Sequence, residues 1–271
     1  MRWVTAQPGR GRAILLGALP LVVLAFAYII AAAARYADNA ADKILPLPGA
    51  MAAAMATLIF EADPLSGQYL FWADTLASLT RLGLGLGIAT ASTLCVGLVV
   101  GSLPPVRATF GPLVTAIAVI PPIALLPILF ILFGLGETAK VALIVVGVAP
   151  FMIRDVAGHI AALPREQVIK ALTLGANSWG VILHVALPQA MPRLIEALRL
   201  SLGPAWVFLI SAEAIAADVG LGYRIFLVRR YLAMDVILPY VAWIAILAVV
   251  IDFALSRGSR RLFGWAHGAA H

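Results

Sequence analysis

Charged residues are scarce in this chain of 271 residues. Asp, Glu, Lys and Arg together make up 12% of it, whereas apolar residues make up 63%, and the mean hydropathy is +1.02. A soluble domain has about 25% charged and about 45–50% apolar residues, so a water-soluble fold could not bury this much apolar surface. The composition therefore excludes a soluble protein and predicts one that lies in a membrane.

Residues with catalytic or metal-binding chemistry are also few. The single cysteine, Cys95, lies inside an apolar run, so it can form neither a disulfide within the chain nor a cysteine cluster for a metal. The four histidines form no His-Glu-x-x-His pair, and no serine lies in a Gly-x-Ser-x-Gly elbow. We predict no catalytic residue, no metal site and no cofactor.

Apolar runs long enough to cross a bilayer are abundant. A spanning helix needs about 20 mainly apolar residues, and we expect six spans at 13–34, 82–103, 108–133, 141–153, 194–217 and 236–255. The fourth is short by itself, but it still counts as a span because Lys140 can snorkel outward and Pro150 can mark a kink instead of an end. The first run follows arginines, as in a signal peptide, but it is longer than the roughly 7–15 residues of a cleavable apolar core. The expected fold class is an all-α membrane protein of about six transmembrane helices.

Two features of the regions outside these spans need interpretation. The run 44–60 begins with prolines and ends with acidic residues, which favours an interfacial helix over a seventh span. Lys and Arg are more numerous on the side that holds both termini, so we expect both ends in the cytoplasm. Arg224, Arg229 and Arg230 fall on the outer side, where they either fold against the bundle or contact an acidic partner surface.

Residues 154–193 form a polar cytoplasmic stretch between the fourth and fifth expected spans. Its core predicts a helix, a break at Gly175 and a second helix that ends near Pro188. Loops of this size on a membrane protein usually carry function.

Residues 167–188 of this stretch resemble the cytoplasmic loop of a known family. These are the six-helix permeases of ATP-binding-cassette (ABC) importers that use a periplasmic binding protein, in the branch with nitrate, sulfonate and taurine systems. The family pattern is Glu-Ala-Ala, three residues, Gly, nine residues and Ile-x-Leu-Pro. Here the matching or conservative positions are Ala171, Gly175, Val185, Leu187 and Pro188. Ile169 and Lys170 depart from the pattern, and weaker similarities extend the resemblance over about residues 45–263.

The resemblance implies an architecture and a set of partners. The fold would be that of a type I ABC importer permease in a bacterial inner membrane, with an N-terminal helix and outer segment at 1–70, a permease core at 71–263 and a tail at 264–271. The partners would be a cytoplasmic ATP-binding subunit dimer, a periplasmic substrate-binding protein, a second permease chain as a homodimer and the lipid bilayer, with no nucleic acid. The residues of the loop that would couple to the ATPase are Ala171, Gly175, Ala176, Trp179, Leu187 and Pro188.

The chain has no P-loop of the form Gly, four residues, Gly-Lys-Ser/Thr. We therefore expect ATP hydrolysis in a separate subunit and no enzymatic activity in this chain. Ionisable groups inside a span need a partner or a cavity. Glu213 either lines the path or a gate, or pairs with a basic group to hold helices together, whereas Arg199 and Asp252 are interpreted mainly as packing or interface residues.

The expected function is the transmembrane permease subunit of an ATP-driven importer for a small solute. The branch implies nitrate, a sulfonate or taurine, whereas residues 169–171 and 223–231 resemble permeases linked to urea and guanidine metabolism. The alternatives are an ion-gradient-driven secondary transporter and an intramembrane enzyme. Secondary transporters usually show inverted repeats and more spans, and neither is evident here.

Overall fold

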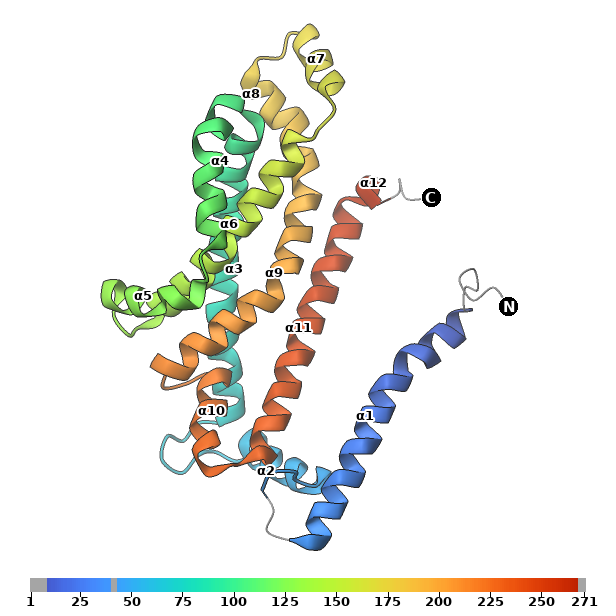
Figure 1. Cartoon of the computed structure of the whole chain (residues 1–271), viewed down its shortest axis with the longest axis vertical. Helices are drawn as coiled ribbons and strands as arrows, with labels where there is room; N and C mark the ends of the chain where they lie inside the picture. Colours follow the sequence, from blue (N-terminus) through green and yellow to red (C-terminus); the bar gives the residue numbers. More distant parts are fainter. Residues whose placement is uncertain (1–8, 40–42, 268–271) are drawn as a thin grey trace. The chain divides into compact units, whose positions relative to one another are not determined.

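The computed structural model of the chain describes residues 9–39 and 43–267 (Figure 1). The N-terminal residues before Gly9 and the last four residues of the expected tail lie outside the described residues. The chain divides into two units: one comprises the described residues up to Tyr69 together with Val228–Tyr240, and the other comprises Leu70–Leu227 and the residues from Val241 onward. The domain division expected from the sequence remains a prediction.

The first unit holds the N-terminal helix and the segment that follows it. α1 (Arg10–Asp38) is long and apolar enough to cross a membrane. α2 (Pro48–Phe60) begins with a proline, whose missing N–H costs nothing at the first position of a helix. With 13 residues α2 is too short for a span, so the expected short helix in this region is confirmed. η4 (Arg229–Tyr231) and the start of α11 (Met234–Leu262) also belong to this unit.

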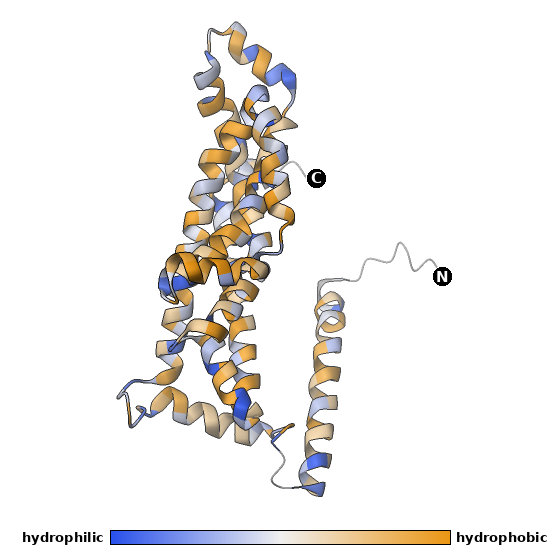
Figure 2. Ribbon diagram, turned by 60° about the vertical axis from the view of Figure 1, so that its left-hand side comes forward, coloured by the Kyte–Doolittle hydropathy of each residue, from blue (hydrophilic) through white to orange (hydrophobic). Residues whose placement is uncertain are grey.

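The second unit contains most of the spanning helices. Besides α1, four helices of the described chain are long and apolar enough to cross a membrane, and a bent pair makes up to one more span, which confirms about six. In Figure 2 these long helices are mainly apolar, and hydrophilic residues gather near their ends and in the short helix α7. The long helices with residues in this unit are α3 (Leu70–Ser102), α6 (Glu137–Ala161), the continuous helix Ser178–Ala216 and α11 (Met234–Leu262).

The expected third span is a bent pair of helices. α4 (Pro104–Val119) meets η2 (Pro122–Leu125) and α5 (Leu126–Phe133) at 88°. The break falls at Ile120, whose backbone is extended, because a proline disfavours the helical conformation of the residue before it. The prolines at this break therefore kink the span.

Other spans also extend beyond their expected bounds, and for two of them the error has a common cause. The second begins at Leu70 instead of residue 82, and the fourth covers Glu137–Ala161 instead of 141–153. Both expectations began only after an ionisable residue, Arg81 or Lys140. The helices continue through these residues because carboxylates of the same unit neutralise their charges.

Close contact between α3 and α6 forms the centre of this unit. A Cβ added to Gly85 would lie 2.7 Å from Ile144, and one added to Gly101 would lie 2.8 Å from Ile160. The order of these contacts shows that the two helices run in the same direction. Small residues allow spanning helices to approach closely, and the glycines on this face of α3 have that role, whereas a Cβ at Gly87 would meet open space.

Candidate functional site

Two short helices form the polar segment after α6. α7 (Arg165–Thr173) and α8 (Ser178–Val181) are joined by a turn at Gly175, and they lie beyond the end of α6 in Figure 1. The side chain of Asn177 caps α8 by accepting a hydrogen bond from the Gly180 N–H at 2.7 Å. The expected helix, glycine break and second helix are confirmed up to this point.

The turn at Gly175 is a specific helix-ending structure. The Gly175 N–H donates to the Leu172 carbonyl, and the Ala176 N–H donates to the Ala171 carbonyl, both at 3.0 Å. This pair of bonds is the Schellman motif, which requires a left-handed residue after the helix. Gly175 has φ +87°, a region that costs other residues about 1–2 kcal/mol. The backbone conformation at this position therefore explains why the family pattern has glycine there.

The second helix does not end near Pro188, contrary to the sequence prediction. A π-helical turn, η3 (Ile182–Ala186), continues α8 into α9 (Leu187–Ala216), and the Leu187 N–H bonds the carbonyl five residues earlier, that of Ile182. Pro188 has no N–H to donate. The helix continues past Pro188 because the π-helical turn lies just before this proline. Pro188 also lies in the first turn of α9, where a missing N–H is tolerated.

The α7–α8 segment presents apolar side chains outward. Leu174 is 88% exposed, Trp179 is 61% exposed and Ile169 is 57% exposed. Gln189 of α9 donates from Nε2 to Oε1 of Gln167 at 2.8 Å, which links α7 to α9. Of the residues expected to couple to an ATPase, Ala171, Gly175, Ala176 and Trp179 lie in or next to the turn, and Leu187 and Pro188 begin α9.

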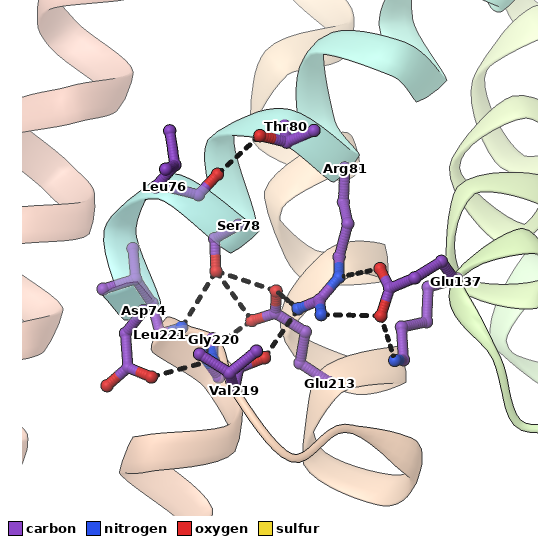
Figure 3. Close-up of polar contacts among 12 residues, drawn as sticks. Asp74, Leu76, Ser78, Thr80, Arg81, Glu137, Glu213, Val219, Gly220 and Leu221 are labelled. Carbon is purple, nitrogen blue, oxygen red and sulfur yellow. Dashed lines mark hydrogen bonds and ion pairs between the residues drawn. The ribbon is translucent and has the colours of Figure 1, made fainter. Parts of the chain in front are cut away.

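A second cluster lies at the other ends of α3, α6 and α9 (Figure 3). Glu213 of α9 is fully buried. Its carboxylate accepts hydrogen bonds from Ser78 Oγ and Arg81 Nη1, each at 2.7 Å, and from the Gly222 N–H at 2.8 Å. Glu213 thus has the basic partner that it needs to hold helices together. Its role as a path or gate residue remains a prediction.

Arg81 connects Glu213 to the start of α6. Its guanidinium donates to Glu137 through Nε and through Nη2, the latter at 2.8 Å from Oε1, and to the Val219 carbonyl through Nη1 at 2.7 Å. Lys140 is buried and donates to Glu137 Oε1 at 2.8 Å. Because Glu137 lies between Arg81 and Lys140, three helices share one ion network.

The same network holds the turn between α9 and α10 (Leu221–Val228). The Gly220 N–H donates to Asp74 Oδ1 and the Leu221 N–H donates to Ser78 Oγ, both at 2.9 Å. With the Gly222 bond to Glu213, three N–H groups at the start of α10 have side-chain acceptors. Two of these acceptors are carboxylates at the positive end of a helix dipole, a stabilising arrangement.

Oδ2 of Asp74 also accepts a hydrogen bond from Arg224 Nε at 2.8 Å. Arg224 therefore folds against α3, as the first of its two alternatives requires, whereas Arg229 and Arg230 are exposed in η4 of the other unit. The network contains three carboxylates and three cations, so it is balanced by charge. The network holds the helix ends together, and it has no net charge that would attract a charged ligand.

The cluster as a whole is not evident from the sequence. The residues come from α3, α6, α9 and α10, and Ser78 and Glu213 are separated by 135 positions. The available signal was the presence of ionisable residues inside helices, each of which needs a partner. Arg199 and Asp252 illustrate the same rule, because they form a two-point ion pair between α9 and α11 at 2.8 and 3.0 Å. In the described residues no group of three His, Cys, Asp or Glu side chains could hold a metal ion.

Comparisons with known proteins identify the family. Residues 83–263 match the family described as the binding-protein-dependent transport system inner membrane component. The chain is 38% identical over 198 residues to the taurine transport system permease protein TauC of Escherichia coli (strain K12), covering 73% of this chain and 71% of TauC. It is 30% identical over 186 residues to the bicarbonate transport system permease protein CmpB of Synechococcus elongatus, covering 68% and 66%.

A third relative is the putative aliphatic sulfonates transport permease protein SsuC of the same Escherichia coli strain. The identity is 32% over 147 residues, which are 54% of this chain and 56% of SsuC. TauC, CmpB and SsuC are permease proteins of the branch that the α7–α8 segment resembles. The family match therefore favours a permease subunit over the two alternatives, a secondary transporter and an intramembrane enzyme.

Solved structures show the same fold. A chain of the MetNI methionine ABC transporter in an inward-facing conformation superposes with a TM-score of 0.63 at 23% identity, covering 72% of this chain and 96% of that one. A chain of a bacterial alginate ABC transporter, in complex with a periplasmic protein, gives 0.62 at 16% identity, covering 93% and 96%. This chain has the type I ABC importer permease fold, and it belongs to the inner-membrane components of binding-protein-dependent transport systems as an ABC importer permease subunit.

Proposed function

We propose that two copies of this chain form the membrane path of an importer for a small organic or inorganic oxyanion, with a sulfonate such as taurine as the leading candidate. Separate ATP-binding subunits drive transport from the cytoplasm, and a periplasmic binding protein delivers the solute. The relatives named for taurine, aliphatic sulfonates and bicarbonate support this substrate class, because all three solutes carry an anionic oxygen group. None of the three is named for a compound of the urea or guanidine type.

The observation that carries the proposal is the hydrogen-bonded α7–α8 turn with its exposed apolar side chains. The chain has no P-loop, so energy must arrive through a contact with another subunit. A short helix with outward apolar side chains fits a groove on a partner, and Leu174 and Trp179 are such side chains. The Schellman bonds at Gly175 fix the turn to the end of α7, and the bond between Gln167 and Gln189 links α7 to α9. A displacement of the turn by a partner is therefore transmitted to a spanning helix.

The proposed orientation follows from this assignment. The α7–α8 turn lies in the cytoplasm, and the ion network at the opposite ends of α3, α6 and α9 lies toward the periplasm. Both chain termini are then cytoplasmic, in agreement with the bias of Lys and Arg along the sequence.

Replacing Leu174 by aspartate is expected to weaken binding of the ATP-binding subunit about tenfold or more. The side chain is 88% exposed, so folding is unaffected. A charge placed in an apolar contact loses the contact and must be desolvated. The measurement is the affinity between the nanodisc-embedded permease and its ATP-binding subunit, by biolayer interferometry.

Leu65→Asp is the matched control. Leu65 is 96% exposed and lies in the segment before α3, which the proposal places in the periplasm. It should leave the affinity within about twofold. Equal affinities for Leu174→Asp and the unchanged chain would contradict the role of this turn.

A further inference from the structure

Two cavities flank Arg107 near the ends of α3, α4 and α6 that lie closest to α7. One has a volume of about 500 Å³ and reaches Arg165 and Ile169 of α7. The other has a volume of about 330 Å³ and reaches Arg154 of α6. Their walls are mainly apolar, and among the described residues the charged ones in these walls are all arginines.

Arg107 is held in place between the cavities. Its Nε donates to the Val100 carbonyl at 3.3 Å, and its Nη2 donates to the Gly101 carbonyl. These carbonyls lie in the last turn of α3, where a basic side chain is favourable. A guanidinium has five N–H donors, so three remain for another acceptor.

The other two arginines have no competing partner in the described part of the chain. Arg154 and Arg165 are exposed, and neither forms a hydrogen bond or an ion pair through its side chain with a described residue. Three guanidinium groups near apolar cavities, without a carboxylate in the walls, produce an attractive potential for an anion. This balance differs from that of the ion network around Glu213, where every charge has a partner of opposite sign.

We infer that these cavities bind an anionic phospholipid such as phosphatidylglycerol. The guanidinium groups hold the headgroup phosphate, a geometry that suits arginine, and the apolar walls receive the first segments of the acyl chains. The cavities lie at the ends of spanning helices, where headgroups are found, and basic pockets between helices are typical sites for such lipids. A free phosphate ion would make no use of the apolar walls.

The bound lipid would support the coupling turn. Val168 and Ile169 of α7 line the larger cavity together with Ile160 of α6, so an occupant contacts both α7 and a spanning helix. This consequence rests on the proposed function, because it places α7 against the ATP-binding subunit. Anionic lipid would then keep α7 in the position from which it transmits movement of the ATP-binding subunit to the spanning helices.

The test is a titration of the full-length chain in detergent with fluorescently labelled phosphatidylglycerol and with phosphatidylcholine of the same acyl chains. Phosphatidylglycerol should bind about tenfold more tightly, as expected for charge-assisted contacts. The double variant Arg154→Gln/Arg165→Gln should lose about tenfold in affinity for phosphatidylglycerol. Its affinity for phosphatidylcholine should not change.

The matched control is Arg260→Gln/Arg261→Gln, which removes the same charge at the end of α11. Both arginines are exposed and line neither cavity, so phosphatidylglycerol affinity should stay within about twofold. Equal losses in the two double variants, or equal binding of the two lipids, would overturn the site.

Two competitors separate the lipid from other occupants. Inorganic phosphate at millimolar concentration should leave the bound phosphatidylglycerol in place, and displacement would show a simple anion site. Displacement by the ATP-binding subunit would instead assign the cavities to that subunit. The titration itself needs neither ATP nor solute, so its failure is distinguishable from a failure of the proposed transport function.

Discussion

Replacing Arg81 by leucine should destabilise the chain by about 3–5 kcal/mol, the usual loss when one partner of a buried ion pair is removed. Glu213 is fully buried, and Arg81 is its cationic partner at 2.7 Å. The variant also removes the donors to Glu137 and to the Val219 carbonyl. Thermal unfolding in detergent, followed by tryptophan fluorescence, measures the loss, and size-exclusion chromatography measures the folded yield.

The double variant Arg81→Leu/Glu213→Leu separates the buried charge from other effects. Removing both charges should recover about 1 kcal/mol or more relative to the single variant. Arg260→Leu, at an exposed position of α11, should change stability by less than about 0.5 kcal/mol. A double variant that is as unstable as the sum of the two singles would show that Arg81 does not neutralise Glu213.

Gly220→Ala is expected to have a comparable effect, about 3 kcal/mol or more. Gly220 has φ +139°, and an added Cβ would lie 2.6 Å from the Glu213 carboxylate and 2.8 Å from Arg81 Nη1. A strained backbone alone costs about 1–3 kcal/mol, and the added carbon would also separate the ion pair. The same unfolding measurement detects the loss.

Gly203→Ala is the matched control for this substitution. Gly203 lies inside α9, and an added Cβ would meet nothing within 4 Å. Alanine is a better helix former by about 1 kcal/mol, so stability should be unchanged or slightly higher. Equal melting temperatures for the Gly220 and Gly203 variants would contradict the close packing of the α9–α10 turn.

The spans and the coupling turn were largely predictable because they depend on local sequence. Apolar runs indicate spanning helices, and Gly175 with its spacing to Pro188 indicated the break after α7. Errors arose where helices pass through ionisable residues. Arg81 and Lys140 interrupt the apolar runs but not the helices, because Glu213 and Glu137 neutralise them.

The ion network was not predictable because its pairs depend on how helices pack. Arg224 and Asp74 are 150 positions apart, and they meet only when α10 folds back against α3. Local sequence shows that such residues need partners, but the identity of each partner follows from tertiary structure. The cavities around Arg107 are likewise formed by segments that are separate in sequence.

We expect ATP, and not an ion gradient, to drive oxyanion import through this chain. The direct test is uptake of radiolabelled taurine by proteoliposomes that contain the permease and its ATP-binding subunit, with the periplasmic binding protein outside. We expect uptake only with ATP at the cytoplasmic face, about a tenfold loss in Leu174→Asp, and little loss in Leu65→Asp. Uptake driven by an ion gradient without the ATP-binding subunit would contradict the account, and ATP-driven uptake of guanidinium in place of taurine would contradict its substrate class.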